Sequence, residues 1–127
     1  MTGFVGNIED LTANNTYFRQ VLFTGQHTQL VLMCLLPNEE IGMEVHEIVD
    51  QFFRIEAGEG KVILNGEEHP IKDGDAIIIP AGTQHNVINT SPTKELKLYT
   101  LYSPPHHKDG VIHKTKEEAQ NDTTDHI

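Results

Sequence analysis

The apolar positions of the chain fall into short runs of strand length that are separated by turn residues. Residues 28–36 form a continuous apolar run, which fits a strand buried on both faces and which periodicity alone does not distinguish from a buried helix. Residues 51–57 alternate instead, so an inward Gln51 would place Phe53 and Ile55 on the same inner face. Further strands are predicted at residues 17–24, 41–46, 61–64, 67–71, 76–79, 85–89 and 95–102.

Turn residues between these runs favour a closed β-structure. Asn65-Gly66 is the strongest short hairpin signal in the chain, because both residue types tolerate the left-handed backbone that a tight turn requires. Many short strands, each bounded by Gly, Pro or Asn, are typical of an all-β jelly roll. The pattern therefore predicts an all-β fold.

The length of 127 residues predicts a single domain with a sizeable core. We expect a barrel core over residues 17–105 and a C-terminal extension over residues 106–127. The single cysteine, Cys34, has no internal partner for a disulfide and lies in the apolar run LVLMCLL, so it is expected in the core.

The two ends of the chain are more polar. Residues 1–15 are expected to form an extended lead-in. A capping-box pattern at Thr115-Lys-Glu-Glu118 predicts a short helix over residues 116–120. The last residues, 121–127, are expected to be disordered.

Charge and hydropathy exclude several classes of partner. The net charge is −10, and the only arginines are Arg19 and Arg54, so the chain is a poor binder of nucleic acid or of anionic membrane surfaces. The N-terminus has no basic region followed by an apolar one, and no apolar run approaches 18 residues. A cytoplasmic protein is therefore expected.

The stretch from residue 42 to residue 89 carries the clearest motif. Its second half has the spacing of the second cupin motif with no position missing: Gly74, five residues, Pro80, one residue, Gly82, two residues, His85, three residues and Asn89. This motif is specific.

The first half of the same stretch resembles the first cupin motif with two ligand types changed. Glu44 stands where that motif has its first histidine, His46 takes the second histidine's place, and Gln51 stands where the motif has its glutamate. The chain therefore resembles the small single-domain cupins, in particular the short bacterial ones similar to mannose-6-phosphate isomerase. The resemblance implies a double-stranded β-helix.

Two imidazoles and one carboxylate are the usual ligands of a divalent metal in a 2-His-1-carboxylate site. Here Glu44, His46 and His85 would supply them, and the first two share one face of a strand. Gln51 would be a fourth ligand through its amide oxygen, or would hydrogen-bond Glu44 or a metal-bound water instead. A mixed set of oxygen and nitrogen donors suits Mn²⁺ or Fe²⁺. Zn²⁺, Ni²⁺ or Cu²⁺ would also bind, because divalent metals later in the first transition row generally have higher affinity for such donors. The alternative is a degenerate site that is only a polar network.

The function follows only in outline. We expect a small polar molecule, either a carbohydrate or an organic acid, in the barrel. The chain would then be an enzyme, such as a metal-dependent isomerase or dioxygenase, or a non-catalytic binding or sensing module. A pocket for a sugar phosphate requires basic side chains near the metal. Of the basic residues only Arg54 lies near the candidate ligands in sequence, and strand alternation predicts that its side chain faces away from them.

Two further features lie outside the motifs. His106, His107 and His113 would form a second metal site or belong to a solvated tail. Outward apolar residues such as Phe52 are liabilities that pairing can cover, and small cupins of this kind are commonly dimers, so a homodimer is expected.

Overall fold

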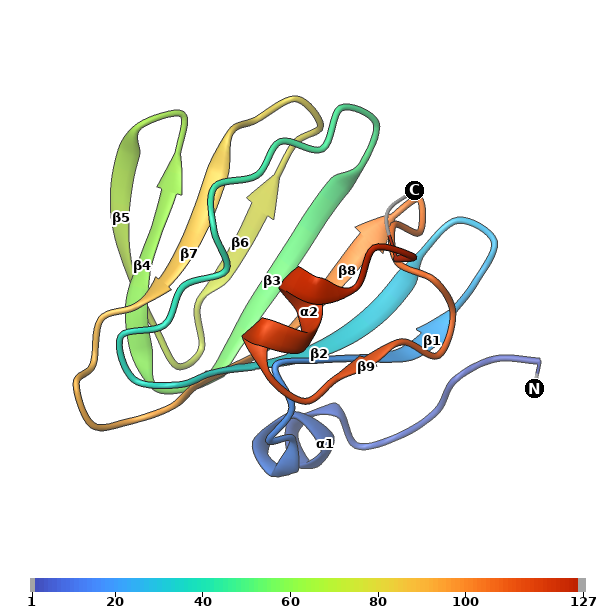
Figure 1. Cartoon of the computed structure of the whole chain (residues 1–127), viewed down its shortest axis with the longest axis horizontal. Helices are drawn as coiled ribbons and strands as arrows, with labels where there is room; N and C mark the ends of the chain where they lie inside the picture. The colour runs from blue at the N-terminus through green and yellow to red at the C-terminus, as the bar shows by residue number, and fades with distance from the viewer. Residues whose placement is uncertain (1, 126–127) are drawn as a thin grey trace.

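Two antiparallel β-sheets enclose the apolar core (Figure 1). The computed structural model describes residues 2–125. The larger sheet has the strand order β6-β3-β8-β2-β1-β9, and the smaller sheet has the order β5-β4-β7. The elements are α1 (Ile8–Asn14), β1 (Arg19–Thr24), β2 (Gln29–Leu35), β3 (Asp50–Ala57), β4 (Glu59–Leu64), β5 (Glu67–Lys72), β6 (Ala76–Ile79), β7 (His85–Asn89), β8 (Leu96–Ser103), β9 (Ile112–His113) and α2 (Lys116–Asn121). The predicted all-β jelly roll is confirmed.

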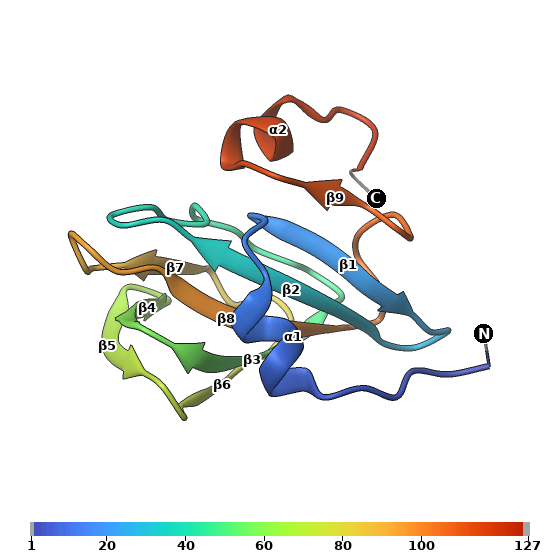
Figure 2. The ribbon, with the colours of Figure 1, turned by 90° about the horizontal axis from the view of Figure 1, so that it is seen from below.

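Alternation along the strands builds the core between the sheets. On β3, Phe53 and Ile55 are fully buried on the same face as Gln51, as the sequence pattern predicts. The apolar run at 28–36 is β2, a strand rather than a helix. Cys34 on β2 is buried as predicted, and α1 contacts β2, β3 and β8 on that side of the sheet (Figure 2).

The smaller sheet depends on two positions that favour glycine. Asn65 and Gly66 both have positive φ values and join β4 to β5, as their hairpin signal predicts. Gly60 on β4 lies so close to the carbonyl oxygen of Ile88 on β7 that a Cβ atom would overlap it. This close approach sets the pairing of β4 with the strand that begins at His85.

The extended lead-in expected over residues 1–15 is wrong, because this segment contains α1. The side chain of Asn7 caps the helix by accepting a hydrogen bond of 3.0 Å from the backbone N–H of Asp10. Acidic residues in the first turn suit the helix dipole, and Thr12 is fully buried. No helix within residues 2–125 is long and apolar enough to cross a lipid bilayer.

The strand predicted at residues 41–46 is also wrong. This segment makes only isolated bridges to β7, at Glu40 and at Glu44. Gly42 interrupts it with φ +110°, and its N–H donates to the side-chain Oδ1 atom of Asn86 on β7 instead of to a backbone carbonyl of that strand. The segment therefore runs antiparallel alongside β7 as an interrupted edge, joined to β7 by isolated bridges and single hydrogen bonds rather than by a continuous ladder.

The C-terminal segment returns to the body of the protein. The predicted helix is confirmed as α2, with the side chain of Thr115 accepting from the N–H of Glu118. Before it, β9 pairs with β1 at the edge of the larger sheet. Residues 121–125 were expected to be disordered, yet Asp122 and Asp125 make side-chain hydrogen bonds that fix them. Residues 126 and 127, for which disorder was also predicted, lie outside the described part of the chain.

Candidate metal centre

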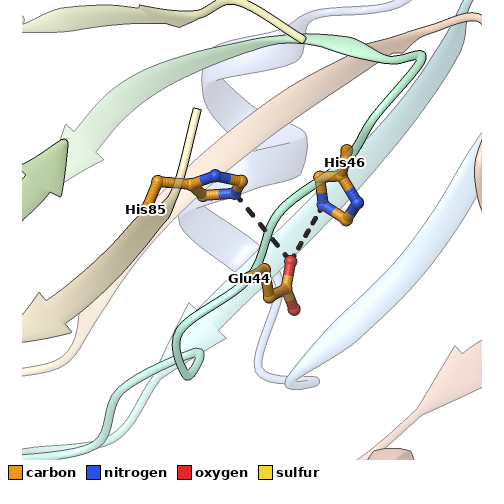
Figure 3. Close-up of side chains that lie close together, drawn as sticks. All are labelled: Glu44, His46 and His85. Atoms are coloured by element: carbon orange, nitrogen blue, oxygen red, sulfur yellow. Dashed lines mark ion pairs between the residues drawn. The ribbon is translucent and has the colours of Figure 1, made fainter. Parts of the chain in front are cut away.

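Three potential metal ligands converge at one end of the barrel (Figure 3). The Oε2 atom of Glu44 lies 2.9 Å from Nε2 of His46 and 3.9 Å from Nε2 of His85. The ligand atoms of all three residues lie within 4.8 Å of one another. A cation with bond lengths of about 2.0–2.3 Å fits among atoms at this spacing.

The backbone fixes the relative positions of these side chains. Glu44 and His85 exchange two backbone hydrogen bonds of 2.8 and 2.9 Å, which join the loop before β3 to the start of β7. The Nδ1 atom of His85 lies 2.9 Å from the carbonyl oxygen of Thr83. Because a carbonyl only accepts, Nδ1 carries the proton and the lone pair of Nε2 is left toward Glu44.

The ring nitrogens that face Glu44 have no competing partner. Nε2 of His46 and Nε2 of His85 are both buried and make no aligned hydrogen bond within residues 2–125. Burial also lowers the pKa of His85, so this imidazole is neutral at pH 7. Burial acts to raise the pKa of Glu44, but contact with His46 and the charge of Arg19 lower it below its usual value overall. The set is therefore one carboxylate and two imidazoles, of which that of His85 is neutral.

Gln51 lies on the inner face of β3, beside Tyr102 of β8 in the strand register, and is 3% exposed. Its Nε2 atom donates to Oγ1 of Thr100 at 3.0 Å, which fixes the orientation of the amide. Its Oε1 atom is buried without a hydrogen-bond partner among residues 2–125. An amide oxygen left in this way has a free lone pair, and its coordination to a metal stays a prediction.

Comparison with known proteins assigns the family. Residues 31–102, more than half of the chain, match the cupin domain profile. The chain belongs to the cupin family. An uncharacterised protein of Bacillus subtilis (strain 168) is 48% identical over 122 residues, which cover 91% of this cupin and 65% of that protein. The cupin thus spans just under two thirds of that relative.

Two further relatives are informative. A crystal structure from Bacillus halodurans is 45% identical with a TM-score of 0.91, and the match covers 94% of each chain. An oxalate-binding protein of Thermotoga maritima is 36% identical over 61 residues, which cover 48% of this cupin and 50% of that protein. The comparisons support a small single-domain cupin, while the finer likeness to mannose-6-phosphate isomerase stays a prediction.

A cavity of about 400 Å³ adjoins the candidate metal centre of this cupin. Its lining includes Glu44, His46, Arg19, His106 and Asp125. The cavity is large enough for a small organic molecule next to the three candidate ligands.

The C-terminal histidines of the cupin do not form a solvated tail. His107 is 7% exposed, and its Nδ1 lies 2.8 Å from Oδ2 of Asp125 while its Nε2 lies 3.2 Å from the hydroxyl of Tyr102. His113 is 4% exposed, and its Nε2 lies 2.9 Å from Oδ2 of Asp122. The tail hypothesis is wrong because the two aspartates return to these histidines and satisfy them.

A second metal site at this place is disfavoured by its hydrogen bonds. His113, Asp122 and Asp125 do lie within metal-binding distance of one another. However, Nη1 of Arg19 lies 3.3 Å from Nδ1 of His113, and an arginine only donates, so Nδ1 accepts and Nε2 carries the proton toward Asp122. With its only lone pair used and a guanidinium beside it, His113 is a poor ligand for a cation.

Arg19 is the residue of this site that sequence reasoning missed. It begins β1 and is buried on the same face as Val21. Strand alternation relative to Val21 would have placed it inside the barrel. Arg54, in contrast, points outward as predicted and pairs with Glu56 at 3.2 Å.

Proposed function

We propose that this cupin binds one divalent metal ion through Glu44, His46 and His85, with the amide oxygen of Gln51 as a fourth donor. The observation that carries the proposal is the pair of buried Nε2 atoms, which face one carboxylate and have no aligned hydrogen bond of their own. Buried polar atoms are nearly always satisfied, so two unsatisfied imidazoles and an amide oxygen at one place favour a missing common partner.

The donor set fits a mid-row divalent cation. One carboxylate and neutral nitrogen and oxygen donors suit Mn²⁺ or Fe²⁺, and Zn²⁺, Ni²⁺ or Cu²⁺ would bind more tightly by affinity order. A bound metal supplies Lewis-acid polarisation of a coordinated oxygen. The protein side chains hold this position at the floor of the cavity.

A small polar molecule would occupy the cavity next to the metal. The Thermotoga maritima relative is named for binding oxalate, which supports an organic acid, and a carbohydrate is the alternative. His106 lines the cavity, and its ring centroid lies 4.3 Å from that of His46. Burial lowers the pKa of His106 below its ordinary value, so this imidazole is neutral at pH 7 and can accept a proton there, which favours an enzyme of the isomerase or dioxygenase type over a purely binding or sensing cupin.

The metal site is tested by the metal content of the purified protein after loading with Mn²⁺ and removal of the excess. The wild type should retain about one equivalent, and His85→Ala should lose most of it, because the neutral Nε2 ligand is gone. His69→Ala is the matched control, since His69 is exposed on β5 and should leave the metal content unchanged. Full retention of manganese by His85→Ala would refute the proposed metal site.

A further inference from the structure

We propose that Arg19 forms an anion subsite in the cavity beside the metal centre, and that the small molecule of this cupin is therefore a carboxylate rather than a neutral sugar. One end of such a molecule would face the metal and a carboxylate would face the guanidinium. The inference specifies the ligand of the proposed function, and it rests on that function only for the end of the ligand that would face the metal.

The first observation is the environment of the Arg19 side chain. Arg19 is 8% exposed, and it lines the same cavity as Glu44 and His46. Its Nε atom is buried and has no hydrogen-bond partner within residues 2–125. No ion pair among these residues involves Arg19 either. A buried cation without a carboxylate partner is unfavourable, unless a ligand completes the pair.

The second observation is that neutral groups hold the guanidinium in place. Nη1 of Arg19 donates to Nδ1 of His113 at 3.3 Å, and His113 in turn donates to Asp122 at 2.9 Å. The guanidinium carbon lies 5.2 Å from the centre of the Phe18 ring, a distance that permits a cation–π interaction. The side chain is therefore fixed before any ligand binds, and no carboxylate of residues 2–125 forms an ion pair with it.

The acidic residues nearby have other partners. Asp125 accepts hydrogen bonds from Nδ1 of His107 and from the backbone N–H of Lys108. Asp122 accepts from His113 and from Thr124. Glu44 faces the two imidazoles of the metal centre. The free N–H of Arg19 thus remains for a ligand.

The shape of the group selects the class of ligand. A guanidinium is planar and matches a carboxylate through charge-assisted hydrogen bonds, whereas a sugar hydroxyl leaves its charge unpaired. Lys116 of α2 lines the same cavity and adds a second positive charge. Although the whole chain carries a net charge of −10, the groups at contact distance determine which ligand is stabilised there.

Calorimetric titration with malonate tests the subsite, and malonamide serves as the uncharged probe of the same shape. Manganese-loaded wild type should bind malonate and bind malonamide at least about tenfold more weakly. Arg19→Gln should lower malonate affinity at least about tenfold while retaining manganese. Arg54→Gln, at the only other arginine, is the matched control and should bind malonate as the wild type does.

Each outcome decides between the inference and the proposed function. Unchanged malonate affinity in Arg19→Gln that retains manganese overturns the subsite and leaves the metal site standing. If the wild type binds no manganese, the metal site fails, and titration of metal-free protein decides: malonate binding that depends on Arg19 supports the subsite, and no binding overturns it. Should Arg19→Gln fail to fold, metal-free wild type decides: preference for malonate over malonamide supports the inference, and equal affinity or no binding overturns it.

Discussion

Asp125 and His107 form a buried pair in which Nδ1 of the imidazole lies 2.8 Å from Oδ2 of the carboxylate. Tyr102 lies on the opposite side of the ring, with its hydroxyl 3.2 Å from Nε2. Burial raises the pKa of Tyr102, so its hydroxyl stays protonated and donates to Nε2. The ring of His107 is therefore neutral and uses both of its nitrogens.

This pair predicts acid destabilisation. Burial and the charge of Arg19 lower the pKa of His107 from 6.5 to about 4. Between these two values the unfolded chain binds a proton at this residue and the folded chain does not, so stability is greatest above pH 6.5 and falls toward pH 4. Thermal unfolding should show this fall for the wild type and a shallower one for His107→Gln. Parallel curves for the two proteins would contradict the assignment.

A second prediction tests Gln51 as a metal ligand. Gln51→Glu would place a second buried carboxylate near Glu44, so without metal the pKa of the new group is raised and the folded state should lose on the order of 1–3 kcal/mol. With Mn²⁺ bound, both carboxylates face a cation and this loss should be offset. The difference in melting temperature between the manganese-loaded and the chelator-treated protein at pH 7.5 should therefore widen.

Gln29→Glu is the matched control for this comparison. Gln29 is fully buried, and its Nε2 donates to Oγ1 of Thr24 and to the carbonyl oxygen of His107. Its replacement should destabilise both forms of the protein equally. If Gln51→Glu behaves in the same way, Gln51 is not part of the metal site.

A third prediction concerns assembly as a homodimer. An apolar row crosses the outer face of the larger sheet, because the strand register places Phe52 beside both Ile78 and Leu101 and places Leu101 beside Leu30. Ile78 is 68% exposed at the edge of this row. A second copy of the chain would cover the row and remove it from water.

Light scattering checks the assembly. The wild type should have twice the chain mass of 14.3 kDa, and Ile78→Glu should shift it toward the single-chain mass. Ile48→Glu is the control, since Ile48 is 78% exposed on a loop outside the row. A wild-type mass of 14.3 kDa at micromolar concentration would refute the homodimer.

The sequence predicts those parts of the fold that depend on local pattern. Alternation locates the inner face of β3 with Gln51, and the second cupin motif locates His85 at the start of β7. The loop at 41–46 escapes prediction because its apolar alternation resembles a strand, and only the positive φ of Gly42 and its bond to Asn86 break the pairing. The local sequence pattern contains no information about a contact between residues so far apart in the chain.

The burial of the C-terminal histidines is unpredictable from the sequence for the same reason. His107 and His113 look like residues of a solvated tail until Asp122 and Asp125 are seen to return to them from beyond α2. These contacts depend on where the chain turns after β9, which no local pattern of polar residues specifies. Arg19 differs, since its alternation with Val21 was available in the sequence.

The loop before β3 and the start of β7 carry the three candidate ligands, whereas many of the residues that line the adjoining cavity come from residues 106–125, beyond the stretch that matches the cupin profile. The candidate metal ligands and many of the residues that would contact a bound molecule thus lie in separate parts of the chain. Substitutions after Tyr102 can reshape what the cavity accepts while the donor atoms stay as they are. Relatives with the same three candidate ligands would therefore be free to diverge in the molecule they bind while the proposed metal site stays intact.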